Sequence, residues 1–133
     1  MVVFLMKSER KLISTGSPFE ATMGYSRAVV QGDWCFVSGV TGYDYKTMIM
    51  PEGVDMQARN CFATIEKVLA EAGFEMSDIA RVQYTVVNAE LVDILIPALG
   101  ETLGEIRPAA TMVIAGLIKP EMLIEIEVTA YRG

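Results

Sequence analysis

The segment from residue 55 to residue 72 constrains this chain more than any other, because it has the pattern of one long amphipathic helix. The apolar residues that recur at helical spacing, and so share one face, are Phe62, Ile65, Leu69 and Ala72. Asp55 is a suitable N-cap, and Gly73 follows where such a helix would end. The segments on either side have strand patterns, so we expect this helix to pack on a sheet.

The rest of the chain alternates between strand and helix patterns. A second helical pattern covers residues 91–103 and ends at Gly104, and Pro97 inside it predicts that this helix starts late or bends. The predicted strands are residues 12–15, 27–30, 34–38, 80–87, 111–117 and 123–130, with a loop over 39–51. The second and third of these strands are spaced as a hairpin, and each helix can cross over on one side of the sheet.

This order predicts an α+β fold, with one mixed sheet and two helices on one face, in a single domain over residues 1–133. The turn at Lys119-Pro120-Glu121 suggests that the last two strands form an antiparallel pair. Residues 111–117 are apolar on both sides, which fits a strand buried on both faces. The sheet face without helices would be bare, and oligomerisation would cover it.

The composition supports an oligomer. Hydrophobic residues make up 52% of the chain, and the mean hydropathy is +0.36, which is apolar for so small a domain. No run approaches the roughly 20 apolar residues of a membrane span, and the apolar start, residues 1–6, is too short for a signal-peptide core. We therefore expect a cytoplasmic protein whose surplus apolar surface is covered by another copy.

Charge and residue types exclude several functions. The net charge is −6, and no Lys/Arg cluster is present, so nucleic acid is not expected as a partner. The chain has no histidine, which excludes Ser-His-Asp and Cys-His catalysis and argues against a metal site. Cys35 and Cys61 are expected as reduced core thiols, and no cofactor is expected.

Four segments, in this order, resemble the reactive-intermediate deaminase (YjgF-like) family, whose members are also called L-PSP endoribonucleases. Gly24-Tyr25-Ser26-Arg27-Ala28 resembles its "PYSQA" signature, with Gly for Pro and Arg for Gln. The other three segments are Phe36-Val37-Ser38-Gly39 ("FVSGQ"), Arg107-Pro108-Ala109-Ala110-Thr111 ("PARS" or "PART"), and Lys119-Pro120 followed by Ile124-Glu125-Ile126-Glu127-Val128 ("LPK…VEIEAIA").

The resemblance implies a chorismate-mutase-like fold and a homotrimer with a small-molecule cleft at each subunit boundary. Enzymes of the family hydrolyse reactive imines and enamines to keto acids and ammonia. Other members are described as ribonucleases or translation inhibitors, a role that the acidic charge and absent histidine oppose here.

The resemblance also assigns the site residues. The family's carboxylate-binding arginine aligns with Ala110, and alanine cannot bind a carboxylate, so activity on 2-imino acids is in doubt. Arg107, three residues earlier, either takes over the anchor or is a solvated residue. Thr111 either lines the same cleft or is simply a good strand former.

Glu125 and Glu127 lie two apart on a predicted strand, hence on one face and about 6.6 Å apart. The resemblance makes Glu125 the residue that orients or activates water, whereas Glu127 is interpreted as solvating the sheet. Tyr25, Ser38 and Gly39 match pocket positions of the family, or else serve local packing and turn chemistry. The leading hypothesis is a cofactor-free hydrolase of an imine or enamine, and the alternative is a non-catalytic trimeric binding or regulatory module.

Overall fold

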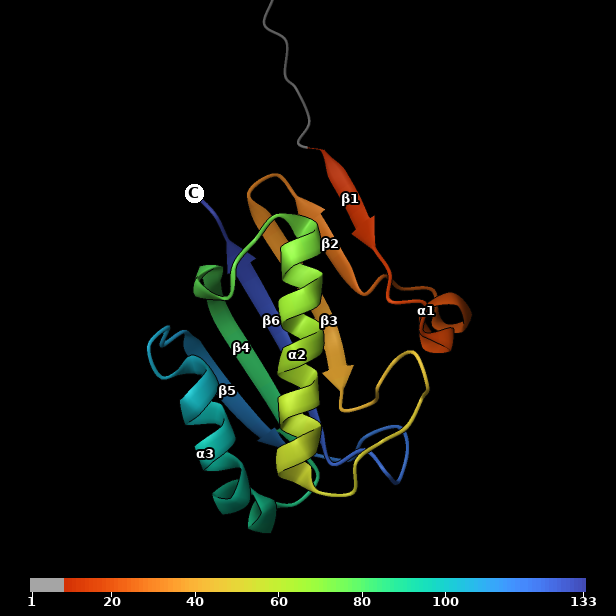
Figure 1. Ribbon diagram of the computed structural model, residues 1–133, viewed down its shortest axis with the longest axis vertical. Coiled ribbons are helices and arrows are strands. Elements are labelled where there is room, and N and C mark those ends of the chain that lie inside the picture. The colour runs from red at the N-terminus through yellow and green to blue at the C-terminus, as the bar shows by residue number, and fades with distance from the viewer. Residues whose placement is uncertain (1–8) are drawn as a thin grey trace, which may run out of the picture.

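The structure is a computed structural model, and it describes residues 9–133. Two helices, α2 and α3, cover one face of a six-stranded sheet (Figure 1). The strands are β1 (Arg10–Ile13), β2 (Ala28–Gln31), β3 (Trp34–Thr41), β4 (Ile79–Val86), β5 (Ala109–Ile114) and β6 (Ile124–Tyr131). The helices are α1 (Pro18–Met23), α2 (Val54–Ala72) and α3 (Val92–Leu103), with short 3-10 turns at Met76–Asp78 and Ala89–Leu91.

The predicted α+β class and the order of the six strands and the two long helices are confirmed, as is the hairpin formed by β2 and β3. Gly73 ends α2 in the left-handed conformation, with φ of 83°. The N-cap of α2, however, is Gly53, and Asp55 lies in the first turn. The prediction that Asp55 caps this helix was therefore wrong, but its carboxylate still complements the helix dipole.

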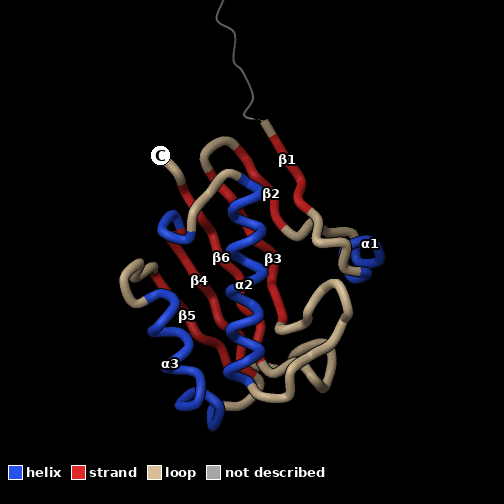
Figure 2. The backbone as a smooth tube through the Cα atoms, in the orientation of Figure 1, coloured by secondary structure: helices blue, strands red, loops and turns tan. Residues whose placement is uncertain are grey.

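The predicted pairing of the last two strands was wrong. The strand order is β1-β2-β3-β6-β4-β5, so β6 is inserted between β3 and β4 and does not touch β5 (Figure 2). β5 pairs with β4 in parallel, because α3 provides the crossover connection that a parallel pair requires. The polar turn at residues 119–121 belongs to a longer connection between two strands that are not neighbours.

β5 is an edge strand that the single chain leaves largely uncovered, so burial of this strand on both faces, which was predicted with an oligomer in view, stays a prediction. Met112 alone is half-buried, and Val113 and Ile114 are 38% and 48% exposed. An apolar edge strand left uncovered is a site for association.

Helix α1, which the sequence analysis did not predict, begins at Ser17-Pro18: the Ser17 side chain accepts a hydrogen bond from the Phe19 N–H at 3.3 Å. Such a cap followed by proline at the first helical position is a helix start signal that the sequence carried. Pro97 lies inside α3, which begins at Val92, one residue after the predicted start at residue 91.

The core lies between the sheet and α2. Alternation along β6 buries Ile124, Ile126 and Val128 against the helices and turns Glu125 and Glu127 to the other face. Among residues 9–133, no helix covers that second face, which we call the open face (Figure 1). It carries an exposed aromatic cluster of Trp34, Phe36 and Tyr131, whose exposed fractions are 44%, 48% and 45%. Within residues 9–133, no helix is both long and apolar enough to cross a membrane.

Candidate functional site

Four of the residues that the sequence singled out line one cavity of about 340 Å³, which we call the α1 cavity. They are Tyr25, Ser38, Gly39 and Glu125, and they come from the end of α1, from β3 and from β6. The remaining lining residues are Phe19, Met23, Arg27, Thr41, Tyr45, Ile118, Met122 and Glu127. Segments that are distant in the sequence therefore meet where β3 ends and β6 begins.

Tyr25 is positioned by the end of α1. Gly24 closes that helix with φ of 74°, and both Gly24 and Tyr25 donate their N–H groups to the Glu20 carbonyl at 3.1 Å. Proline, which the family signature has at position 24, cannot adopt a positive φ. The glycine is thus required by the local backbone, and it turns the chain from α1 into β2.

Ser38 and Gly39 lie at a register irregularity of β3 between Val37 and Val40. The Ser38 hydroxyl donates to the Ser26 carbonyl at 2.6 Å, so its proton already holds β3 to the preceding segment. Its lone pairs can still accept a hydrogen bond from a ligand.

Gly39 is needed because Glu125 packs directly on its backbone. A Cβ atom at position 39 would lie 2.5 Å from the Glu125 Cδ and 2.7 Å from Oε1. The carboxylate of Glu125 therefore rests on the glycine, with its carboxyl end in the cavity. Burial, followed by the neighbouring Glu127 carboxylate, raises the pKa of Glu125, and Arg27 partly opposes this rise.

Arg27 is the site residue that sequence reasoning missed, because it was interpreted only as the start of a strand. Its side chain is 1% exposed, and Nη1 donates to the Gly39 carbonyl at 2.6 Å. Nη2 makes a long contact with the Tyr25 hydroxyl at 3.5 Å, and the guanidinium lies 5.1 Å from the Tyr45 ring centre. The signal was the arginine that replaces glutamine in the "PYSQA" segment.

Glu20 supplies the counter-charge. Its Oε2 lies 3.6 Å from Arg27 Nε and accepts hydrogen bonds from the Thr15 hydroxyl at 2.6 Å and the Thr15 N–H at 3.2 Å. Burial acts to raise the pKa of Glu20, but the hydrogen bonds from Thr15 and Ser14, together with Arg27, outweigh it and lower the pKa. The lowered pKa keeps the Glu20 carboxylate ionised at neutral pH, where its charge opposes that of Arg27.

Arg107, Ala110 and Thr111 lie elsewhere, at the β5 edge of the sheet, and none of them lines the α1 cavity. Arg107 is exposed, with φ of 51°. Thr111 lies on the open face, where it accepts a long contact from Arg81 at 3.5 Å. Ala110 is in register with the buried Val82, so its methyl group lies on the helix side of the edge strand.

A second hollow lies on the open face beside the α1 cavity and shares Ser38 and Glu127 with it. It continues across the sheet to Arg81 and Gln83. A second copy packed on the open face would therefore border the α1 cavity.

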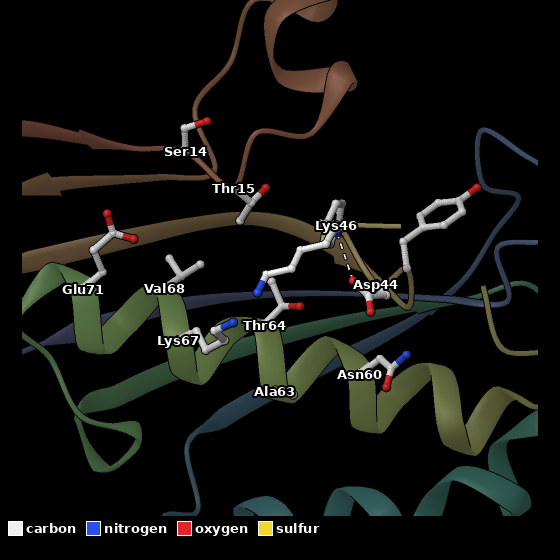
Figure 3. Close-up of a pocket in the computed structure, with 12 residues that line it drawn as sticks. Ser14, Thr15, Asp44, Lys46, Asn60, Ala63, Thr64, Lys67, Val68 and Glu71 are labelled. Carbon is white, nitrogen blue, oxygen red and sulfur yellow. Dashed lines mark hydrogen bonds between the residues drawn. The ribbon is translucent and has the colours of Figure 1, made fainter. Parts of the chain in front are cut away.

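A third cavity, of about 430 Å³, lies between α2 and residues 43–46 (Figure 3). In this view Lys46 extends toward α2, where Thr64 and Lys67 lie. The one hydrogen bond drawn there joins the Lys46 N–H to Asp44 Oδ1, at 2.9 Å. The charged residues that line this third cavity are all exposed. We therefore regard the α1 cavity, with its buried arginine and half-buried glutamate, as the stronger candidate site.

Cys35 and Cys61 are buried and not bonded to each other. Burial raises the pKa of both thiols, that of Cys35 to about 11. Neither has thiolate character at neutral pH, so neither is a candidate nucleophile. Within residues 9–133, no three Cys, Asp or Glu side chains gather as a metal site would require.

The sheet order, the helices on one face and the cavity at the β3–β6 junction define a small α+β protein of the chorismate-mutase-like class. The family model for Endoribonuclease L-PSP matches residues 15–132. An uncharacterized protein of Streptomyces coelicolor is 32% identical over 123 residues, which cover 91% of each chain. A RutC family protein of Pyrococcus horikoshii is 31% identical, covering 81% of this chain and 86% of its own.

Solved structures agree. A member of the YjgF/YER057c/UK114 family from Mycobacterium tuberculosis superposes with a TM-score of 0.85 at 34% identity, covering 93% of this chain and all of its own. The YjgF gene product of E. coli superposes with a TM-score of 0.82 at 25% identity, covering 92% and 99% of the two chains. The chain belongs to the Endoribonuclease L-PSP family, the YjgF-like or Rid proteins.

Proposed function

We propose that this protein hydrolyses a small imine or enamine at the α1 cavity. The observation that carries the proposal is the Glu125 carboxylate, held over Gly39 in a partly desolvated cavity. A carboxylate whose pKa is raised toward neutrality is a better general base than a fully solvated one.

In the proposed reaction, Glu125 accepts a proton from water as the water oxygen forms a bond to the iminium carbon. Glu125 then returns this proton to the nitrogen. As the carbon–nitrogen bond breaks, Glu125 transfers the hydroxyl proton to the leaving ammonia, so that a carbonyl compound and ammonium leave. Tyr25 shapes the cavity wall; because burial raises its pKa, with Arg27 opposing, it is present as a neutral phenol. The Ser38 hydroxyl can accept a hydrogen bond from the substrate, since it donates its own proton to the Ser26 carbonyl.

We also propose that the working form is a homotrimer. The exposed aromatic cluster on the open face and the uncovered edge strand β5 both support association. In a trimer, the β5 edge of one copy, with Arg107, Ala110 and Thr111, would reach the α1 cavity of the next copy. The predicted site residues at the β5 edge would then lie beside those that line the cavity. The two unbonded cysteines support a cytoplasmic location.

The second candidate is a non-catalytic binding or regulatory module. This second candidate is favoured by Ala110, which stands in place of the family arginine. The resemblance implies that this arginine binds the carboxylate of the substrate. Ribonuclease activity has the least support, since the net charge is −6 and two glutamates line the cavity.

The test is ammonia release from freshly generated imines, with 2-iminobutanoate as one member of the panel. We expect catalysis on at least one imine, a rate that rises with pH through a pKa above the usual glutamate range, and loss of this rate in Glu125→Gln. The control is Glu66→Gln on the exposed side of α2, which makes the same charge change away from the cavity. Absence of acceleration on every imine would leave the binding module.

A further inference from the structure

The charges that face the α1 cavity are not balanced. Its charged lining residues are Arg27, Glu125 and Glu127. Arg27 is 1% exposed, whereas Glu125 is half-buried and Glu127 is exposed. A ligand in this cavity would therefore meet the two carboxylates, and the guanidinium would offer it almost no surface.

Groups of the protein also surround the guanidinium of Arg27, although within residues 9–133 its Nε makes an ion pair and no hydrogen bond. Glu20 faces its Nε at 3.6 Å, and the Gly39 carbonyl accepts from Nη1 at 2.6 Å. The rings of Tyr25 and Tyr45 lie against the guanidinium, with centres at 5.6 Å and 5.1 Å. Arg27 acts on Glu125 as well as on Glu20, but this one guanidinium faces the carboxylates of Glu20, Glu125 and Glu127, so the net charge around the cavity is negative.

The nearby cation at Lys119 does not change this sign. Its Nζ lies 5.9 Å from the centre of the Phe19 ring, and Lys119 does not itself line the cavity. Lys119 is exposed, and an exposed ammonium is screened by water and salt.

The rest of the wall suits a cation with an apolar body. Phe19, Tyr25 and Tyr45 present aromatic rings, and Met23, Ile118 and Met122 present aliphatic surface. Aromatic faces and carboxylates both attract a positively charged nitrogen, and aliphatic surface favours an uncharged carbon skeleton. A ligand carboxylate would instead meet like charges in a partly desolvated space.

We propose that the α1 cavity selects a cationic nitrogen compound without a carboxylate group, that is, the iminium ion of a simple aldehyde or ketone and not a 2-imino acid. The part of this proposal that concerns the reaction rests on the proposed function. The part that concerns ligand binding does not. Arg27 is a positioning residue in this arrangement and does not bind the ligand. It donates a hydrogen bond to the carbonyl of Gly39, and the side chain of Glu125 packs on that glycine.

Binding tests the specificity directly with two stable compounds that differ at one group. The probes are 2-butylamine, as its ammonium ion, and 2-aminobutanoate, in which a carboxylate replaces one methyl group. We expect the full chain to bind 2-butylammonium at least about tenfold more tightly, by calorimetry or NMR titration, and added salt to reduce the difference.

Glu127→Gln sharpens the test, because it removes one cavity carboxylate from an exposed strand position. We expect it to weaken 2-butylammonium binding by about threefold to tenfold, with Glu66→Gln as the matched control that leaves binding unchanged. Thermal unfolding of both variants confirms that each is folded. Equal or tighter binding of 2-aminobutanoate by the unmodified protein would overturn the specificity. Loss of that binding in Arg107→Gln would then identify a neighbouring copy's arginine as the anchor.

Turnover separates this inference from the proposed function. An amine oxidase generates 2-iminobutane from 2-butylamine, and an amino-acid oxidase generates 2-iminobutanoate from 2-aminobutanoate. Faster ammonia release from 2-iminobutane supports both proposals. Faster release from 2-iminobutanoate overturns the specificity and supports hydrolysis. If neither imine is hydrolysed while 2-butylammonium still binds in a Glu127-dependent way, the specificity stands and hydrolysis fails.

Discussion

Arg27 and Arg107 show how differently one residue type can be used in the same small protein. Arg27 is buried between α1 and β3, and it contacts Glu20, Gly39 and Tyr25. Arg107 is exposed beside the β5 edge in a left-handed backbone conformation, and no hydrogen bond or ion pair of its guanidinium is found within residues 9–133. Arg107, which the sequence analysis selected, has no side-chain role in the described part of the single chain. Arg27, which it passed over, holds several residues of the α1 cavity in place.

This difference between the two arginines shows that burial decides whether a guanidinium can bind an anion. A buried guanidinium is fixed in place, and its charge is already compensated, so it shapes the site without binding an anion. An exposed guanidinium costs little to move and can bind an anion only if another surface positions it. The single chain therefore fixes Arg27 beside the α1 cavity, and in the proposed trimer Arg107 would depend on a neighbouring copy for its position.

The largest expected effect comes from Arg27→Met. Removing the cation leaves Glu20 as a buried, unpaired charge and frees the Gly39 carbonyl, so we expect a loss of about 3 kcal/mol in the free energy of unfolding. Urea denaturation measures it. The matched control is Arg59→Met, which breaks an exposed pair with Glu101 at 2.9 Å and should cost about 0.5 kcal/mol or less. Similar losses in the two variants would contradict the contrast between buried and exposed arginines.

Next in size is the effect of a methyl group at two glycines. A Cβ at Gly42 would lie 2.6 Å from the Gln57 Cα, which is helix backbone that cannot move aside. We expect Gly42→Ala to cost about 2 kcal/mol of stability. A Cβ at Gly39 meets only the Glu125 side chain, which can swing away. Gly39→Ala should therefore lose less stability, about 1 kcal/mol, but abolish any Glu125-dependent catalysis. If Gly39→Ala kept full Glu125-dependent activity, the close contact of these two residues would have no role.

A smaller effect of opposite sign is expected at Arg107. Its φ of 51° is unfavourable for any residue with a Cβ, and glycine adopts it freely. We expect Arg107→Gly to raise the free energy of unfolding by about 0.5 kcal/mol, since the gain in the folded state is partly offset by the greater freedom of the unfolded chain. The measurement is again urea denaturation. A destabilised Arg107→Gly variant would show that Arg107 makes a structural contact, most simply with another copy.

The smallest effect on stability is expected for Ala110→Arg, which adds a side chain at an exposed position of an edge strand. The change should stay within about 0.5 kcal/mol. Its informative readout is ammonia release from 2-iminobutanoate. A gain of activity would show that the β5 edge of one copy reaches the cavity of another. No gain, in a variant that remains oligomeric by light scattering, would show that position 110 does not border the cavity.

Much of the fold could be predicted from local pattern. The helical spacing of residues 62, 65, 69 and 72 predicted α2, and alternation along residues 124–128 predicted which side of β6 is buried. The partners of β5 and β6 could not be predicted in this way, because pairing depends on contacts between segments that local periodicity does not describe. α1 was missed although its Ser17-Pro18 start was present, since a helix this short has no repeated apolar face.

The candidate site was predicted in part for a similar reason. Tyr25, Ser38, Gly39 and Glu125 were selected by their order in a family pattern, and they line one cavity. Arg27 was passed over because nothing next to it in the sequence distinguishes a buried arginine from an exposed one. Its partners, Glu20 and Gly39, are brought to it by α1 and by β3.

By itself, the sequence determined the types and order of the main elements, the buried face of β6, and the absence of histidine chemistry. These properties depend on side chains close together in the chain, where geometry follows from backbone periodicity. The tertiary structure alone decided that β6 separates β3 from β4, that Arg27 is neutralised by Glu20, and that Glu125 is the carboxylate that rests on Gly39. Such outcomes depend on desolvation and on distances between segments far apart in the sequence, and only the packed fold sets both.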